Sequence, residues 1–224
     1  MPTLRGQLDV SDHDVRVASQ VASGMVETGA AAMVGDLDAG ARVDFGCRHG
    51  GSQRVYGGAL PVSPALADYT ALAVAQALPA DLECTVITNS PTVASALLQH
   101  PRADLFLLGG RVFKHSAVTC GAAAVEAAQN VSADLCLIGV TGVHPEAGLT
   151  TGDAEDAAMK RALAARAAET YVLASSEKIG TASPYRVLPW GQITGIITDA
   201  DPSDEVIKQL SALDVEILHA GAVL

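Results

Sequence analysis

Asp134-Leu-Cys-Leu-Ile-Gly139, the helix-like stretch 153–168 and Tyr171-Val-Leu-Ala174 follow one another along the chain and decide the fold class. The two apolar runs lack strict alternation of polar and apolar residues, which is typical of strands covered on both faces. The stretch between them is rich in alanine and opens on Asp153, a residue type that caps helices. This order predicts two parallel strands joined by a crossover helix.

The same alternation continues from residue 70 to the end of the chain. It predicts an α/β fold, a mostly parallel sheet with helices on both faces, whose ligand binds beyond the carboxyl ends of the strands. Ser90, followed by Pro91, and Ser203 are expected to cap two of the helices. Strands are expected at 84–88, 104–108, 134–139, 171–174, 195–198 and 215–218, and helices at 70–78, 91–99, 121–130, 153–168 and 203–212.

The first seventy residues carry a weaker pattern. Residues 15–25 have helical spacing, and residues 27–35 are typical of a turn that leads into a strand. Residues 41–69 contain paired glycines and two prolines and show no periodicity, which predicts an irregular excursion. We therefore expect an N-terminal tail at 1–14 and one α/β domain over 15–224.

Composition excludes several classes of protein. The chain has 224 residues, a length typical of one domain, and its 49% hydrophobic and 17% charged residues indicate a folded protein. Its apolar runs are too short to span a membrane, and its start lacks an export signal, so the cytoplasm is the expected location. A net charge of −11 opposes binding to nucleic acid unless the cations gather on one face. The four cysteines form no CxxC pair and are expected to be buried apolar residues.

Small polar residues, glycines and lysines follow four successive expected strands. Taken singly, each fits a structural role: a helix cap, a tight turn or a surface lysine. Taken together, hydroxyls, amides and ammonium groups at one edge of a sheet predict a site for a small phosphorylated molecule. The residues concerned are Asn89 and Ser90, Gly109 and Gly110, the stretches Gly139-Val-Thr-Gly-Val143 and Gly148-Leu-Thr-Thr-Gly152, Ser176 and Lys178, and Lys160 on the helix before the strand at 171–174.

Motifs for other chemistries are missing from the sequence. It contains no GxxxxGK[ST], no GxGxxG opening a helix and no GxSxG, so neither ATP, a dinucleotide nor hydrolase chemistry is indicated. The six histidines do not form a helical metal motif, so we expect neither a metal nor a cofactor. Asp153, Glu155 and Asp156 are expected to cap a helix rather than to act as acids or bases.

Six ordered motifs between Thr70 and Leu218 resemble the effector-sensing domain of DeoR-type bacterial transcriptional regulators. The resemblance implies a fold similar to that of ribose-5-phosphate isomerase and glucosamine-6-phosphate deaminase. The motifs are Thr70-Ala-Leu-Ala-Val-Ala-Gln-Ala-Leu78, Val86-Ile-Thr-Asn-Ser90, Phe106-Leu-Leu-Gly-Gly110, Ala133-Asp-Leu-Cys-Leu-Ile-Gly139, Gly148-Leu-Thr-Thr151 with Ala157-Ala-Met-Lys-Arg161 behind it, and Ser175-Ser-Glu-Lys-Ile-Gly180.

The sequence departs from the family pattern at two places. The family's Asp-x-Gly-Thr-Thr turn is not intact, and its nearest equivalents are Asp38-Ala-Gly40 and Asp68-Tyr-Thr70. The basic helix-turn-helix expected at the amino terminus is not recognisable in residues 1–53. An alternative division makes 1–53 a degenerate helix-turn-helix remnant and 54–224 the sensor.

The resemblance implies a regulator of sugar metabolism that senses a phosphorylated sugar, is not an enzyme and forms a homo-oligomer. DNA is an expected partner only if a helix-turn-helix is present; a membrane is not. By resemblance Lys178 would hold the phosphate, Asn89 and Ser90 would bond phosphate or hydroxyls, and Lys160 would shape the pocket or be structural. Two alternatives are a sugar-phosphate isomerase or deaminase and a module that only oligomerises. The expected effector site comprises Asp38, Gly40, Thr70, Asn89, Ser90, Gly109, Gly110, Lys160, Ser176 and Lys178.

Overall fold

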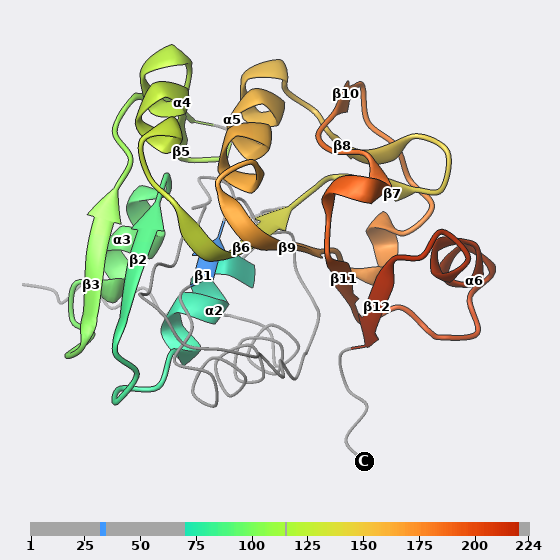
Figure 1. Ribbon diagram of the computed structural model, residues 1–224, viewed down its shortest axis with the longest axis horizontal. Helices are drawn as coiled ribbons and strands as arrows, with labels where there is room; N and C mark the ends of the chain where they lie inside the picture. The colour runs from blue at the N-terminus through green and yellow to red at the C-terminus, as the bar shows by residue number, and fades with distance from the viewer. Residues whose placement is uncertain (1–31, 35–69, 115, 220–224) are drawn as a thin grey trace, which may run out of the picture.

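A computed structural model describes residues 32–34, 70–114 and 116–219 of the chain. The helix expected at 15–25 and the excursion expected at 41–69 lie outside the described residues, as do Asp38, Gly40 and Cys47. Five strands form a wholly parallel sheet in the order β1-β6-β9-β11-β12 (Figure 1). These strands are β1 (Ala32–Val34), β6 (Ala133–Gly139), β9 (Ala167–Leu173), β11 (Gly195–Thr198) and β12 (Glu216–His219).

Two further parallel strands extend this arrangement on the side of β1. β2 (Cys84–Thr88) pairs with β3 (Ala103–Leu107), and β2 lies beside β1. The predicted class, α/β with mostly parallel strands, is therefore confirmed. The strand expected within residues 27–35 is also confirmed, because Ala32 to Val34 pair with Leu135 to Leu137 of β6.

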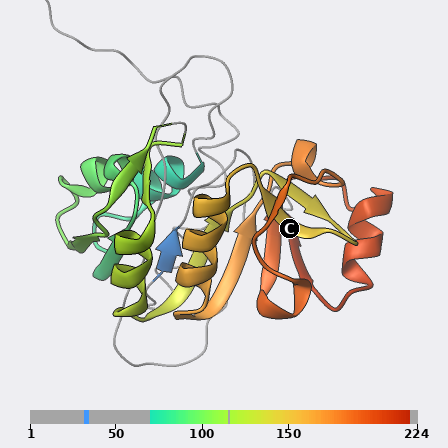
Figure 2. The same cartoon turned by 90° about the horizontal axis from the view of Figure 1, so that it is seen from above.

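Helices cover both faces of the sheet. α2 (Thr70–Ala77) and α3 (Pro91–Leu97) pack on one face, and α4 (Ala122–Gln129), α5 (Ala154–Ala164) and α6 (Glu205–Ser211) pack on the other. Figure 2 shows α4 and α5 on the opposite side of the strands from α2. Two short 3-10 helices, η1 (Ser176–Lys178) and η2 (Trp190–Gln192), follow the later strands.

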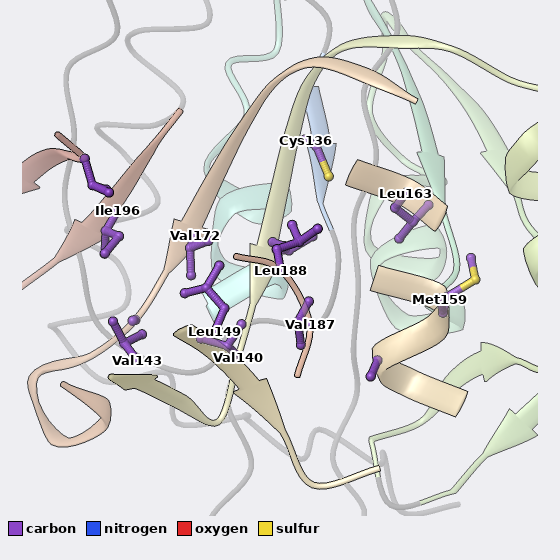
Figure 3. Close-up of a cluster of buried hydrophobic side chains, with 14 of the residues drawn as sticks. Cys136, Val140, Val143, Leu149, Met159, Leu163, Val172, Val187, Leu188 and Ile196 are labelled. Atoms are coloured by element: carbon purple, nitrogen blue, oxygen red, sulfur yellow. The ribbon is translucent and has the colours of Figure 1, made fainter. Parts of the chain in front are cut away.

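The core is divided by the sheet because successive side chains of a strand point to opposite faces. Leu135 and Leu137 of β6 belong to the cluster with α2 and α3, whereas Cys136 and Ile138 belong to the cluster with α4, α5 and α6. Figure 3 shows the second cluster, in which Met159 and Leu163 of α5 contribute. Removing these apolar surfaces from water is the main favourable term of the fold.

The cysteines of the described chain are buried free thiols, as the sequence predicted. They are Cys84, Cys120 and Cys136. Burial raises the pKa of Cys84 to about 11 and raises the pKa of Cys136 well above its usual value. Both groups are therefore neutral thiols near pH 7 and behave as small apolar residues.

Two small antiparallel units were not predicted from the sequence. β4 (Arg111–Phe113) pairs with β5 (Val118–Cys120), and a three-stranded sheet has the order β10-β8-β7. Its strands are β7 (Gly142–His144), β8 (Gly148–Thr151) and β10 (Tyr185–Arg186). These strands have two to four residues, which is too short for hydrophobic periodicity to indicate them. They lie among the loops that follow the parallel strands.

Three local predictions were wrong. The helix expected at 153–168 ends at Ala164, because residues 167–173 form β9 and pair with β6. Asp204, not Ser203, caps α6 and accepts hydrogen bonds from two backbone N–H groups. β3 is not covered on both faces, since Phe106 is 49% exposed.

None of the helices in the described part of the chain combines the length and apolar character that crossing a bilayer requires.

Candidate functional site

The order of the strands places the candidate site at one edge of the sheet. The chain runs from β1 outward to β2 and β3, and then returns to the other side of β1 as β6. β1 and β6 therefore form the point at which the strand order reverses. In open α/β sheets ligands bind beyond the carboxyl ends of the strands at such a point. The loops after β2, β6 and β9 carry the polar residues singled out in the sequence.

Asn89 and Ser90 follow β2 directly and are almost wholly buried. The Ser90 hydroxyl accepts a hydrogen bond from the Thr92 N–H at 3.3 Å, so Ser90 caps α3. Asn89 is held against Thr119 of β5: its Nδ2 donates to the Thr119 carbonyl at 3.0 Å, and its own carbonyl accepts from the Thr119 N–H at 2.7 Å. The Thr119 hydroxyl also donates to the Leu108 carbonyl at 2.6 Å. Thr119 therefore holds Asn89 by two hydrogen bonds, one to the side-chain Nδ2 and one to the backbone carbonyl.

Three buried polar atoms lack hydrogen-bond partners within the described structure. They are Asn89 Oδ1, Thr92 Oγ1 and Ser175 Oγ. Asn89 and Ser175 are each 3% exposed; Asn89 is the first residue after β2, and Ser175 is the second residue after β9. A buried polar group without a partner costs about 1–3 kcal/mol, so such groups are rare in native proteins. Groups of this kind at a sheet edge are suited to bind a polar ligand.

Lys160 lies in a buried ion pair on α5. Its Nζ is 2.6 Å from Asp156 Oδ2, and the Thr151 hydroxyl at the end of β8 donates to the same oxygen at 2.7 Å. The Lys160 and Asp156 side chains are only 3% and 5% exposed. Asp153 caps α5 as the sequence predicted, but Asp156 belongs to this buried cluster rather than to the cap.

Lys178 lies on η1, three residues beyond Ser175, and is 8% exposed. The segment that follows it is fixed to β7, because the Gly180 N–H donates to the Val143 carbonyl at 2.8 Å. Ser176, one of the expected site residues, is exposed, and its backbone N–H donates to Asp199 Oδ1. Its neighbour Ser175 is the buried serine of this loop.

The two glycines after β3 have different surroundings. Gly110 has a positive φ of 152°, and a Cβ placed on it would lie 3.0 Å from the Ala124 Cβ and 3.2 Å from the Cys120 carbonyl oxygen. Gly110 therefore permits close packing of β3 against β5 and α4. A Cβ on Gly109 would meet no atom within 4 Å. Thr70, the remaining described candidate, is the first residue of α2.

Hydrogen bonds connect these positions through the small antiparallel units. Thr119, which holds Asn89, precedes Cys120, whose thiol donates to Glu155 at 3.6 Å at the start of α5. Beyond Lys178, the Thr181 hydroxyl donates to the Thr141 carbonyl at 3.2 Å. The Thr141 N–H in turn donates to the Thr150 carbonyl, next to Thr151. The segment after β9 is therefore bonded to the segment after β6, and the segment after β2 is connected through β5 to the start of α5.

Sequence reasoning missed Thr119, Asp156 and Ser175. Asp156 was assigned to a helix cap with its neighbours, although its i, i+4 spacing to Lys160 is a signal for an ion pair. Ser175 lies in the motif Ser175-Ser-Glu-Lys-Ile-Gly180 but is not among the residues expected at the site. Thr119 offered no signal, because its contact with Asn89 spans thirty residues. The described residues contain no group of three or more side chains that could hold a metal ion.

The described residues form an α/β domain in which loops with buried polar side chains follow the carboxyl ends of parallel strands. A family model for the DeoR C-terminal sensor domain matches residues 68–200, which is more than half of the chain. The chain therefore belongs to the DeoR sensor-domain family.

Relatives of known description are transcriptional regulators. The chain is 34% identical over 137 residues to the HTH-type transcriptional repressor GlcR of Bacillus subtilis (strain 168), which covers 61% of this chain and 53% of the relative. It is 25% identical over 152 residues to a putative aga operon transcriptional repressor of Escherichia coli O157:H7, covering 68% and 56%. It is 32% identical over 133 residues to the HTH-type transcriptional regulator GolR of Listeria innocua, covering 59% and 52%. The chain spans about half the length of the curated relatives it matches.

Proposed function

We propose that this chain is the sensor of a DeoR-type regulator of sugar metabolism and that it binds a phosphorylated sugar at the carboxyl ends of β2 and β9. The observation that carries the proposal is the burial of Ser175 and Lys178 in the segment that follows β9, and of Asn89 at the end of β2. An ammonium group suits a phosphate, and buried amide and hydroxyl groups suit the hydroxyls of a sugar. Although the chain has a net charge of −11, Lys178 supplies a cation at the place where a small anion would bind.

We propose that the fold is of the kind found in ribose-5-phosphate isomerase and glucosamine-6-phosphate deaminase. It is supported by the wholly parallel order of β1, β6, β9, β11 and β12. We also propose that one α/β domain extends over 15–224, with the excursion at 41–69. The pairing of β1 with β6 supports this division over one in which the sensor begins at residue 54.

A sensor is favoured over an enzyme of the same fold by the state of Asp156. An isomerase or deaminase needs a carboxylate base placed over a substrate carbon. Asp156 is the buried carboxylate of the described residues, and its Oδ2 already accepts a hydrogen bond from Thr151 and pairs with Lys160. Its arrangement is that of a structural ion pair. The regulators among the relatives agree with this assignment.

The regulatory output requires more than binding. Effector must favour one conformation over another, because equal affinity for two states changes neither population. We propose that the sensor forms a homo-oligomer whose geometry changes with occupancy. The names of the relatives denote helix-turn-helix regulators. DNA binding by this protein requires a helix-turn-helix unit.

A thermal-shift series tests the proposal. Pentose and hexose phosphates are added to wild type, Lys178→Ala and Lys208→Ala, the last being an exposed lysine of α6. A phosphosugar present at 100 times its Kd stabilises the protein by about 2.7 kcal/mol, which raises Tm by about 5–10 °C. We expect this shift in wild type and Lys208→Ala and a much smaller one in Lys178→Ala. Absence of a shift with every phosphosugar in wild type would refute the proposal.

A further inference from the structure

In the side-chain amide of Asn89, Nδ2 makes a hydrogen bond and Oδ1 makes none. Nδ2 lies 3.0 Å from the Thr119 carbonyl oxygen. A carbonyl oxygen can only accept a hydrogen bond, so the atom facing it must be the NH2 group and not the amide oxygen. The chemistry of Thr119 therefore fixes which way the Asn89 amide is turned. Oδ1 is the atom left over.

Asn89 Oδ1 is buried and has no partner among the described residues. The residue is 3% exposed, so bulk water does not satisfy this oxygen. The amide is also unable to turn over without cost, because a flipped amide would bring two carbonyl oxygens together at the Thr119 contact. Asn89 thus presents to its surroundings an acceptor, Oδ1, whose orientation is fixed by the bond of Nδ2 to Thr119.

From this geometry we infer that Asn89 Oδ1 binds a donor group of the effector, a sugar hydroxyl or amine, and not its phosphate; the inference rests on the proposed function. A phosphate dianion carries only acceptor oxygens, and placing one against Oδ1 would oppose two negative partial charges. A hydroxyl donates a hydrogen bond to Oδ1 and satisfies it. Of the two roles left open for Asn89, binding of phosphate or of a hydroxyl, the unpartnered Oδ1 favours the second.

The inference divides the site into two parts with different chemistry. The end of β2 offers the acceptor Oδ1, and the segment after β9 offers the Lys178 ammonium group, which suits the phosphate. Asn89 is then a specificity-determining residue: it selects among phosphorylated molecules by requiring a donor at one position. A ligand that lacks this donor leaves Oδ1 buried and unsatisfied, which is the arrangement that discriminates most strongly against an analogue.

The chain is well suited to a spectroscopic test because it contains two asparagines, Asn89 and Asn130. Asn130 also donates its Nδ2 to a backbone carbonyl, that of Glu126 at 2.8 Å, but it is exposed. Protein labelled with 13C and 15N in asparagine is titrated with ribose 5-phosphate, with inorganic phosphate and with ribose. We expect ribose 5-phosphate to move the Asn89 13Cγ signal downfield, as an accepted hydrogen bond does, and inorganic phosphate to leave it in place. Asn130 should not respond.

Affinity measurements on variants provide the second readout. Asn89→Leu is expected to weaken binding of ribose 5-phosphate by about 10- to 100-fold, the effect of losing one buried hydrogen bond, and Asn130→Leu to leave it unchanged. The affinity for inorganic phosphate, measured by competition, should be the same in wild type and in both variants. If another pentose or hexose phosphate is the ligand found by thermal shift, it replaces ribose 5-phosphate in both measurements.

The outcomes separate this inference from the proposed function. If inorganic phosphate moves the Asn89 signals, or binds Asn89→Leu more weakly than wild type, either result would show that Asn89 holds phosphate. The inference would then be wrong, and the proposed sensor function would be unaffected. If phosphosugars fail to bind but ribose binds and moves the Asn89 13Cγ signal, the proposed function is wrong and the role of Asn89 stands. If a phosphosugar binds tightly without moving that signal, the inference is overturned.

Discussion

Replacing Lys160 by methionine is predicted to destabilise the protein strongly. Methionine keeps most of the side-chain volume but removes the ammonium group, 2.6 Å from Asp156 Oδ2. Because both side chains are at most 5% exposed, the carboxylate would remain buried with the Thr151 hydroxyl but without its counter-ion. Removing one partner of a buried pair costs about 3–5 kcal/mol. For a chain of this length that loss lowers Tm by about 6–20 °C.

Urea denaturation followed by circular dichroism measures the effect, and the chain supplies a matched control. Lys208 also lies on a helix and is 3.7 Å from Glu205, but these side chains are 58% and 75% exposed. Lys208→Met is therefore expected to change the free energy of unfolding by less than about 0.5 kcal/mol. Adding Asp156→Leu to Lys160→Met should restore most of the lost stability, because no buried charge remains. A single Lys160→Met variant within 1 kcal/mol of wild type would refute this reasoning.

Two further predictions concern backbone packing and pH. Gly110→Ala should lower the free energy of unfolding by about 1–3 kcal/mol, because the new Cβ would lie 3.0 Å from the Ala124 Cβ at a positive φ. Gly109→Ala should leave the free energy of unfolding nearly unchanged, because its Cβ would meet no atom within 4 Å. Equal losses of stability in both variants would contradict this prediction. Cys84 is neutral in the folded state up to a pKa of about 11, against 9.0 for an ordinary thiol, so the folded state holds the proton longer. Stability should therefore fall by about 2 kcal/mol between pH 9 and 11, and urea titrations of Cys84→Ala should lack that share of the fall; an identical pH dependence in the variant would count against it.

The sequence predicted those elements whose signal is local. The strands at 84–88 and 195–198 were placed correctly because runs such as Cys84-Thr-Val-Ile-Thr88 are short, apolar and bounded by polar residues. The end of α5 was misplaced because Ala165-Arg-Ala-Ala168 is helix-like in composition, whereas pairing with β6 draws residues 167–173 into the sheet. The cap at Ser90 was recognised as one option and is confirmed by its bond to Thr92.

For the candidate site, the sequence indicates which strand ends carry polar groups but not the contacts that those groups make. Parallel strands bring their carboxyl ends together, and that topological rule is enough to select Asn89 and Lys178. The orientation of Asn89 depends on Thr119, which reaches it through β5, a strand that the sequence did not indicate. The same limit applies to Thr151, whose bond to Asp156 depends on the position of β8. Long-range partners of this kind carry no periodic signal.

The position of β1 has a consequence for cutting the chain. The family match begins at residue 68, but Ala32 to Val34 lie between β2 and β6 and pair with residues about a hundred positions further along. A truncated protein that started at the family boundary would lose a central strand and expose the backbone edge of β6. Unpaired edges of this kind recruit strands from other molecules and lead to aggregation. Expression of the sensor by itself therefore has to include the segment that carries β1.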